Sequence, residues 1–300
     1  MQKLGRLITA MVTPFADDGS VDTQQAKRLA LALLDSGSDG LVVSGTTGES
    51  PTLTREEKLA LFSEIKRTVG DLGAVVAGTG TYSTAESIEL TREAERRGVD
   101  GILLVVPYYN KPTQEGLYQH FAAIARSTNL PCIVYNVPSR TVTNLAAETV
   151  ARLSRIENIV GVKEASGNLE QISKIIQDSR EGFLVWSGND SDTLPLLAVG
   201  GYGVISVVSH LVGRQLKEMI DRFLSGDGDR AAALHRRLLP LINAMFVVSN
   251  PIPVKYALNV AGYRVGKPRL PLLEPDEKTA AQIRSAMQGY QIDLPAGSRA

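Results

Sequence analysis

The sequence predicts an α/β protein that folds as a TIM (β/α)8 barrel with a helical appendage at its C-terminal end. Eight short runs of apolar and β-branched residues recur along the 300 residues, with helix signals between them. Each run is apolar almost throughout instead of alternating, which is typical of parallel strands covered on both faces. The first run leads into Thr13-Pro14-Phe15 and not into a glycine-rich dinucleotide-binding turn. A barrel is therefore favoured over a doubly wound sheet.

The predicted strands give the order of the barrel, and the segments between them carry helix-capping signals. Thr54 with Glu57, and Ser83 with Glu86, have the spacing of capping boxes, and Gly98 marks a helix end. The predicted strands begin at Leu7, Gly40, Ala74, Gly101, Cys132, Ile159, Phe183 and Gly203.

The strand pattern stops near Leu224, where Gly and Asp residues cluster at positions 225–229. Helices are predicted beyond this cluster over residues 230–246, 253–260 and 274–287. We therefore divide the chain into a catalytic barrel, residues 1–224, and a C-terminal helical region, residues 225–300, that packs on the barrel.

The composition argues against several classes of protein. Thirty-two Lys and Arg balance 32 Asp and Glu, so neither a nucleic acid nor a membrane surface is an expected partner. The single cysteine, Cys132, cannot form an intrachain disulfide, and a cytoplasmic location is the simplest expectation. Three widely spaced histidines and one cysteine offer little for a metal site, and no apolar run is long enough to span a bilayer.

Lys163 is the residue of most interest among the predicted strand ends, where the reactive groups of TIM barrels gather. On two-residue alternation its side chain shares a face with Gly161 and Ala165, two small residues that leave it room. Burial of this kind disfavours the ammonium form, lowers the pKa and makes a nucleophilic amine available. The alternative is a lysine that extends from the strand end into solvent.

Tyr135 and a Gly-Thr loop complete the candidate site. Tyr135 ends the preceding strand, so its hydroxyl could exchange the protons that formation of a Schiff base requires; alternatively it packs on a loop. Residues 45–48 combine two threonine hydroxyls with backbone N–H groups that can hold a carboxylate, although spacing alone favours a simple turn. The glycine-rich run 200–203 precedes a strand, and we assign it to packing.

Four motifs resemble the dihydrodipicolinate synthase (4-hydroxy-tetrahydrodipicolinate synthase) family of pyruvate-dependent class I aldolases. They are GTTGES, PYYNKP, YNVPSR and VGVKEAS, at residues 45–50, 107–112, 135–140 and 160–166. The resemblance covers essentially the whole chain. It implies an enzyme that condenses pyruvate with L-aspartate 4-semialdehyde through a lysine Schiff base, in lysine and diaminopimelate biosynthesis.

The resemblance also implies a role for each matching residue. Lys163 would form the imine with pyruvate, and Tyr135 would donate and accept protons. Thr46 would continue the proton relay to Tyr109, which reaches the neighbouring subunit's site in this family. Thr47 would bind pyruvate and hydrogen-bond Tyr135.

Three further residues would contact the substrates. Gly188 would lie beside bound substrate, and Ile205 would contact pyruvate through its backbone. Arg140 would bind the carboxylate of the semialdehyde, for which a guanidinium group is well suited. The resemblance implies a homo-oligomer, usually a tetramer built as a dimer of dimers, that needs neither a metal nor an organic cofactor.

The resemblance further suggests weak feedback inhibition by lysine. Two extra cations near a site for cationic lysine should oppose its binding. Ser50, Glu86 and Tyr108 match the family's lysine pocket, whereas Arg55, Lys58 and Tyr82 replace the His, His and Asn of the sensitive enterobacterial type.

Two other functions stay open. A sister aldolase that cleaves a keto-deoxy-sugar acid would share Lys163 and Tyr135 but would have no use for Arg140. A catalytically silent barrel that binds a keto acid is less consistent with the complete set of reactive residues.

Overall fold

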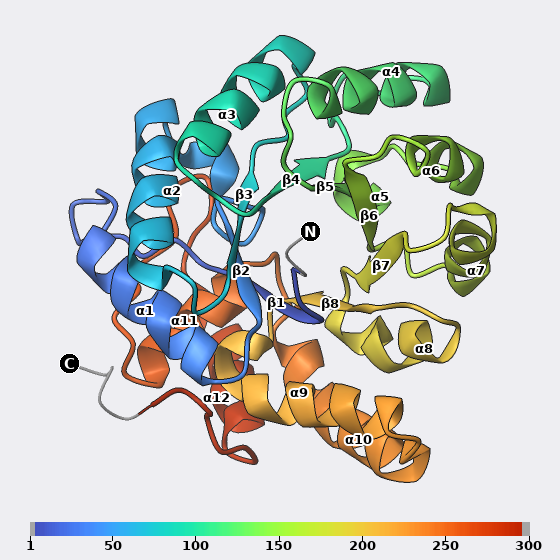
Figure 1. Ribbon diagram of the computed structural model, residues 1–300. Coiled ribbons are helices and arrows are strands. Elements are labelled where there is room, and N and C mark those ends of the chain that lie inside the picture. Colours follow the sequence, from blue (N-terminus) through green and yellow to red (C-terminus); the bar gives the residue numbers. More distant parts are fainter. Residues whose placement is uncertain (1–3, 296–300) are drawn as a thin grey trace.

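Eight parallel strands close into a barrel in chain order, and β8 pairs with β1 to complete it. We describe residues 4–295 of the computed structural model (Figure 1). The predicted fold class is confirmed, and only β7 begins one residue later than expected. The strands are β1 (Leu7–Ala10), β2 (Gly40–Val43), β3 (Ala74–Gly78), β4 (Gly101–Val105), β5 (Cys132–Asn136), β6 (Ile159–Glu164), β7 (Leu184–Ser187) and β8 (Gly203–Ser206).

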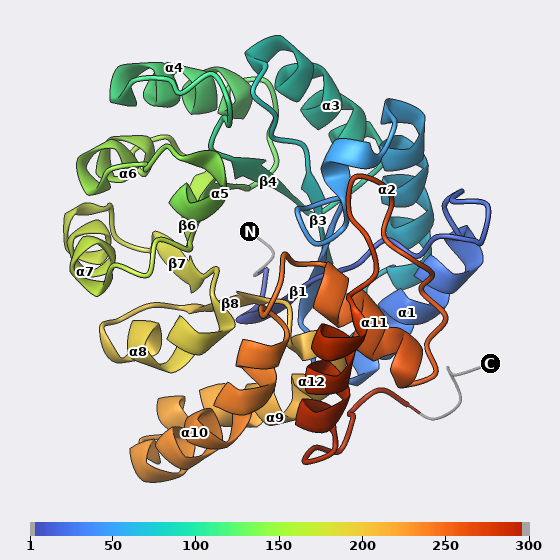
Figure 2. The ribbon, with the colours of Figure 1, turned by 180° about the vertical axis from the view of Figure 1, so that it is seen from behind.

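Helices surround the barrel and connect its strands (Figures 1 and 2). Two short 3-10 helices, η1 (Ser50–Thr52) and η2 (Asp190–Asp192), follow β2 and β7. The α-helices of the barrel are α1 (Thr23–Asp35), α2 (Arg55–Val69), α3 (Thr84–Arg96), α4 (Gln114–Ala125), α5 (Pro138–Thr141), α6 (Ala147–Leu153), α7 (Leu169–Asp178), α8 (Thr193–Ala198) and α9 (Ser209–Leu224).

One of the two predicted capping boxes forms, and the other was wrong in part. At the start of α2, Thr54 Oγ1 accepts from the Glu57 N–H at 3.2 Å, and the Glu57 carboxylate accepts from the Thr54 N–H at 2.9 Å. At the start of α3, Ser83 caps the Glu86 N–H, but the Glu86 carboxylate accepts from Thr81 Oγ1 at 3.3 Å instead. A nearby hydroxyl has replaced the backbone donor that a capping box would use.

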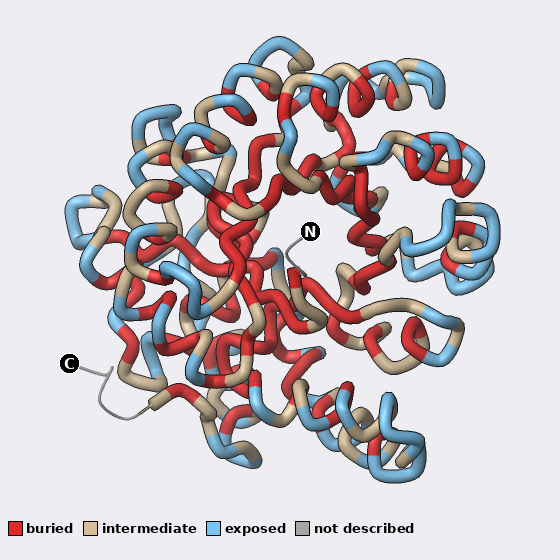
Figure 3. The backbone as a smooth tube through the Cα atoms, in the orientation of Figure 1, coloured by how far each residue is buried: buried red, intermediate tan, exposed pale blue. Residues whose placement is uncertain are grey.

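Apolar side chains form two cores, one on each side of the strands. The outer core lies between the strands and the helices, and the inner core fills the barrel with side chains that include Ile8, Val76, Ile133 and Trp186. Figure 3 shows the strands as an almost continuous buried ring. Burial on both faces explains why the strand sequences are apolar throughout.

Three helices follow the barrel and lie along one of its sides (Figure 2). They are α10 (Gly228–Ala244), α11 (Ile252–Val260) and α12 (Glu277–Met287). Helix α10 packs on α9, and α12 packs on α10 and α11. The division of the chain after residue 224 stays a prediction. Between residues 4 and 295, no helix is both long and apolar enough to cross a lipid bilayer.

Candidate active site

Lys163 lies inside the barrel, close to the C-terminal end of β6. Lys163 is 5% exposed, and its Nζ lies 4.3 Å from the centre of the Tyr135 ring. The register of the sheet brings the two together, because Tyr135 on β5 is the direct partner of Lys163. On the other side of Lys163, β7 places the buried Trp186. The alternative of a lysine that extends into solvent is therefore wrong.

The surroundings of Lys163 increase the fraction of the side chain that is the neutral amine. Burial lowers the pKa of its ammonium group to about 8, and the positive charge of Arg140 acts in the same direction. The buried carboxylate of Asp190 opposes this shift. At pH 7 roughly a tenth of the molecules then carry the free amine, far more than for a lysine in water.

Tyr135 is also buried, and its phenol is protonated at neutral pH. Burial raises the pKa of Tyr135 to about 12, although Arg140 and a hydrogen bond with Thr46 act in the opposite direction. A protonated phenol beside a free amine can supply the proton that leaves with water during imine formation. Thr46 therefore stands where it can pass a proton to or from Tyr135.

The loop between β2 and η1 presents Thr46 and Thr47 in a fixed conformation. Its turn is closed by hydrogen bonds from Glu49 N–H to Thr46 O at 3.1 Å and from Ser50 N–H to Gly45 O at 3.2 Å. Across residues 4–295, the N–H groups of Thr46 and Thr47 have no hydrogen-bond acceptor. These N–H groups remain available to an anion, as in the backbone nests that bind carboxylates.

Thr47 has a different partner from the one that the resemblance implied. Its Oγ1 accepts a hydrogen bond from Asn250 Nδ2 at 2.9 Å, and the residue is 3% exposed. The hydrogen bond to Tyr135 is made by Thr46. Between residues 4 and 295 the structure has no hydrogen bond from Thr47 to Tyr135, but the Thr47 proton is still free to donate, so the bond that the resemblance implied stays a prediction.

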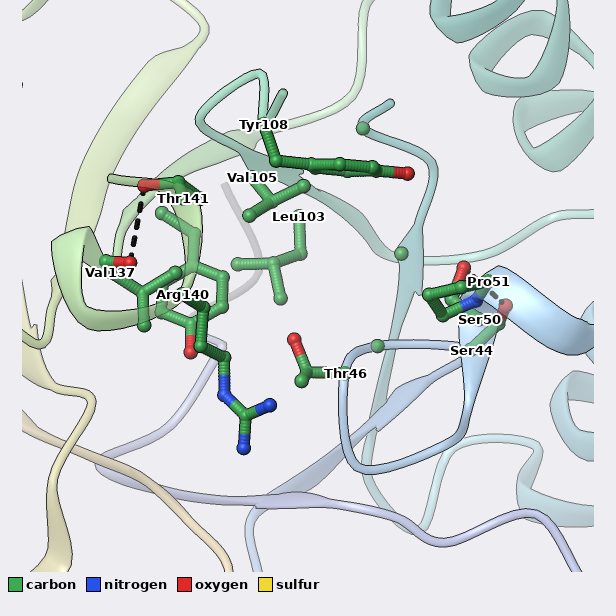
Figure 4. Close-up of a pocket in the computed structure, with 14 residues that line it drawn as sticks. Ser44, Thr46, Ser50, Pro51, Leu103, Val105, Tyr108, Val137, Arg140 and Thr141 are labelled. Carbon is green, nitrogen blue, oxygen red and sulfur yellow. Dashed lines mark hydrogen bonds between the residues drawn. The ribbon is translucent and has the colours of Figure 1, made fainter. Parts of the chain in front are cut away.

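A cavity of about 210 Å³ opens in front of these groups (Figure 4). Arg140 extends from α5 into it, toward the loop that carries Thr46. Lys163 does not line this cavity itself; its amine lies over the ring of Tyr135, which does. The cavity is lined by Ser44, Gly45, Thr46, Ser50, Pro51, Gly78, Gly80, Leu103, Val105, Tyr108, Tyr135, Val137, Arg140 and Thr141.

Gly188 and Ile205 lie where the sequence placed them, at the ends of β7 and β8. A Cβ atom at Gly188 would lie 3.2 Å from Lys163 Cε and 2.6 Å from Ala165 Cβ, so only glycine leaves room here. Ile205 is fully buried in the inner core. Gly188 therefore borders the Lys163 side chain, and the expected contacts of both residues with substrate stay predictions.

Tyr109 does not enter the site of its own chain. It follows β4, is 94% exposed and has a φ of 76°. Such a backbone conformation is uncommon for a tyrosine. The adjacent Tyr108 points into the cavity instead (Figure 4).

Two buried polar residues of the site were missed by the sequence patterns. Asp190, in η2, accepts hydrogen bonds from Ser206 Oγ at 2.5 Å and from the Val207 N–H at 2.9 Å, and so joins the ends of β7 and β8. Asn250 precedes α11 and reaches Thr47 across the molecule. Asp190 follows the end of β7, so the rule that reactive groups gather at strand ends, which identified Lys163, could also have identified Asp190. Nothing in the local sequence points from Asn250 to Thr47.

The arrangement suits amine chemistry on an anionic carbonyl compound. A protonated phenol, a guanidinium group and the Thr46 backbone line one cavity, and the buried amine of Lys163 lies against the phenol ring behind it. In residues 4–295, no three His, Cys, Asp or Glu side chains are grouped so that they could hold a metal ion. The expectation of a cofactor-free reaction stays a prediction.

Comparison with known proteins identifies close relatives. The model of the dihydrodipicolinate synthetase family matches residues 3–289. A protein of Dehalococcoides mccartyi named 4-hydroxy-tetrahydrodipicolinate synthase is 67% identical over 295 residues, which are 98% of this chain and 99% of the relative.

Solved structures agree with this result. The dihydrodipicolinate synthase of Bacillus anthracis is 46% identical, with a TM-score of 0.95 over 97% of this chain and 99% of that one. The enzyme of Cyanidioschyzon merolae, crystallised with lysine bound, is 46% identical, with a TM-score of 0.94 over 95% and 98% of the two chains. The resemblance in the four motifs is thereby confirmed: the chain belongs to the dihydrodipicolinate synthetase family.

Proposed function

We propose that this chain is a 4-hydroxy-tetrahydrodipicolinate synthase, which condenses pyruvate with L-aspartate 4-semialdehyde in lysine and diaminopimelate biosynthesis. The names of its relatives support this activity. One structural observation carries the chemistry: the amine of Lys163 is buried and lies 4.3 Å from the centre of the Tyr135 ring. This is the arrangement that a Schiff-base enzyme requires.

The proposed reaction begins at Lys163. Its neutral amine adds to the keto carbon of pyruvate, and Tyr135 provides the proton with which the hydroxyl group leaves as water. The protonated imine acidifies the methyl group of pyruvate, and loss of a proton gives an enamine. The enamine carbon then attacks the aldehyde of the second substrate. Finally, the amino group of the product displaces Lys163, closes the ring and releases the enzyme.

The two carboxylates would be bound at opposite sides of the cavity. Thr47 and the N–H groups of its loop would hold the pyruvate carboxylate, with Gly188 and Ile205 beside it. Arg140 would bind the carboxylate of the semialdehyde, since its guanidinium group reaches into the cavity. Thr46 would relay protons between Tyr135 and Tyr109 of a second subunit.

Reductive trapping tests the Schiff base. Incubation with pyruvate and borohydride should add the mass of a reduced pyruvate adduct to Lys163, located by peptide mass spectrometry. The Lys163→Ala variant should show no adduct. An unmodified wild-type chain would instead support a silent barrel that only binds a keto acid.

The Arg140→Ala variant tests the second substrate. We expect trapping with pyruvate to be retained and turnover of the semialdehyde to fall by about 100-fold or more, because the carboxylate of the semialdehyde loses its charged partner. Arg155→Ala removes an exposed arginine away from the cavity and serves as the control. Unchanged turnover in Arg140→Ala, together with cleavage of keto-deoxy-sugar acids, would favour the sister aldolase.

The assembly and location of the protein are also proposals. The exposed Tyr109 supports a homo-oligomer in which this side chain enters a neighbouring subunit, and we propose a tetramer built as a dimer of dimers. The single, buried Cys132 supports a cytoplasmic location.

A further inference from the structure

Asn250 connects the two regions of the site that would hold the substrate carboxylates. Its side-chain amide donates to Thr47 Oγ1 at 2.9 Å, and its backbone carbonyl accepts a hydrogen bond from the Arg140 guanidinium group at 3.1 Å. The residue is 6% exposed and lies between α10 and α11, about 200 residues after Thr47 along the chain. A residue of the C-terminal region therefore contacts both Thr47 and Arg140.

The hydrogen bond from Asn250 sets the direction of the Thr47 hydroxyl. A threonine hydroxyl has one proton to donate and can accept other hydrogen bonds. Because Thr47 Oγ1 already accepts from the Asn250 amide, its own proton is free to point elsewhere. A carboxylate only accepts hydrogen bonds, so a hydroxyl held as a donor is ready for it before the substrate arrives.

A buried ion pair keeps Asn250 and the Thr47 loop in fixed relative positions. Lys255, on α11, donates to the Glu49 carboxylate at 2.9 Å, to Thr13 O at 3.1 Å and to Lys267 O at 3.0 Å. Lys255 is fully buried and Glu49 is 1% exposed at the side chain. The second oxygen of Glu49 accepts from the Arg269 N–H at 2.8 Å. The loop is thus tied to the C-terminal region at Glu49 as well as at Thr47.

The side chain of Asn250 also carries an unusual cost. Its Oδ1 is buried and has no hydrogen-bond partner among residues 4–295. A buried acceptor without a partner destabilises the fold, and such groups are uncommon in native proteins. An apolar residue at this position would avoid that cost but would lose the one hydrogen bond that the side chain makes, the bond to Thr47.

We infer that Asn250 is a positioning residue that orients the Thr47 hydroxyl as a donor to the pyruvate carboxylate and holds Arg140 at the second carboxylate. The inference rests on the proposed function, since it assigns those carboxylates to Thr47 and Arg140. Asn250 itself acts through these two residues and not on the reacting atoms.

The Asn250→Asp variant tests the inference with a side chain of nearly the same shape. A carboxylate at this position accepts and does not donate, so the Thr47 hydroxyl must turn its proton toward it and away from the substrate. We expect the KM for pyruvate to rise by at least about tenfold, the factor typical of losing a hydrogen bond to a charged group. Trapping at Lys163 should fall by the same factor at low pyruvate and recover at saturating pyruvate.

Two further variants exclude simpler explanations. Asn250→Ala removes the donor without adding charge and should raise the KM by about threefold or more. Asn243→Asp adds the same charge at an exposed position of α10 and should change nothing. If Asn250→Asp fails to fold, as judged by circular dichroism, Asn250→Ala decides the question. A wild-type KM in Asn250→Ala would overturn the inference.

A double-mutant cycle with Thr47→Val asks whether Asn250 acts through Thr47. If it does, the KM for pyruvate of the double variant should be no higher than that of the more impaired single variant. If instead the increases in KM of the two single variants multiply in the double variant, the inference is overturned. The proposed function is judged separately: a wild-type chain that pyruvate does not trap would refute that function, whereas trapping that is equal in wild type and Asn250→Asp at every pyruvate concentration would refute only the role of Asn250.

Discussion

Lys163 shows how the environment of one side chain can prepare its chemistry. The same lysine in water would be almost fully charged at neutral pH. In the barrel it lies among Tyr135, Trp186 and the backbone of Gly188, where burial outweighs the Asp190 carboxylate that favours the charged form. The fold thus maintains a buried amine of reduced basicity, which is what a nucleophile for a keto acid needs.

The lowered pKa predicts how imine formation responds to pH. The reactive form is the deprotonated amine, so the trapping rate at low pyruvate should rise as the pH increases through the Lys163 pKa of about 8 and level off above it. Between pH 7 and pH 9 the rate should increase about tenfold, as the free amine goes from a minor to the major form. Quenched-flow trapping with cyanoborohydride measures this. A rate that keeps rising beyond pH 10 would show that the amine has an ordinary pKa.

For single residues, the sequence patterns predicted the reactive side chains better than the residues that hold them in position. Lys163 and Tyr135 stand at the ends of apolar runs, and the ends of parallel strands meet at one rim, so local patterns were enough for them, whereas Arg140 was indicated only by the resemblance. The roles assigned to them remain to be tested. Asn250 could not be predicted in this way because its contact with Thr47 depends on where a distant helix packs.

Among the elements, strands β5 and β6 determine the geometry of the site. Their register shifts between Cys132 and Ile133, and beyond that point Tyr135 lies opposite Lys163. The next pair, Asn136 and Glu164, is buried and joined by hydrogen bonds of 3.0 and 3.2 Å from Asn136 Nδ2 to the carboxylate. Since a slip of one residue would turn each side chain to the other face, this pair holds Lys163 and Tyr135 inside the barrel.

The segment formed by η1, α2 and α3 bears on regulation by lysine. Lys58 of α2 is 8% exposed, and its charge interacts with the Glu86 carboxylate of α3. The Glu86 carboxylate, which would attract the cationic lysine inhibitor, therefore already interacts with the Lys58 cation of the protein. Burial lowers the pKa of Lys58, while Glu86 opposes that change.

We predict weak or absent inhibition by L-lysine on this basis. Initial rates should be unchanged at millimolar lysine, and the Lys58→His variant should become more sensitive because it removes the lysine cation that interacts with Glu86. The Cyanidioschyzon merolae relative, which was crystallised with lysine bound, is a suitable comparison for the assay. Strong inhibition of the wild-type enzyme would refute the prediction.

The whole molecule brings together groups that are scattered along the chain, and one of its tyrosines points outward. Barrel closure brings the ends of the strands to one rim, and residues on or after β2, β3, β4 and β5 line the cavity there. Tyr109, at 94% exposure, contributes nothing to that cavity in its own chain. The fold class followed from the repeated apolar runs, whereas the relation between Tyr109 and the site depends on a second chain and could only be inferred from the resemblance.

Subunit complementation tests the role of Tyr109. Tyr109→Phe and Lys163→Ala should each be nearly inactive alone, but co-expressed chains should regain about a quarter of wild-type activity, because half of randomly formed dimers contain one complete site. Co-purification through two different tags provides the mixed dimers alone, in which one of the two sites is complete and about half of wild-type activity is expected. Full activity of Tyr109→Phe alone would exclude a proton-relay role, and a lack of complementation would show that Tyr109 does not serve the neighbouring subunit.

The link from Asn250 and Lys255 to the loop at Thr47 and Glu49 has a consequence for synthesis of the protein. Every strand and every strand-borne reactive group leaves the ribosome before Asn250 does. A nascent or prematurely terminated chain that ends before this residue lacks the donor to Thr47 and the cation beside Glu49. We therefore expect the site to reach its full affinity for pyruvate only once the segment that contains Asn250 and Lys255 has been synthesised and has packed on the barrel.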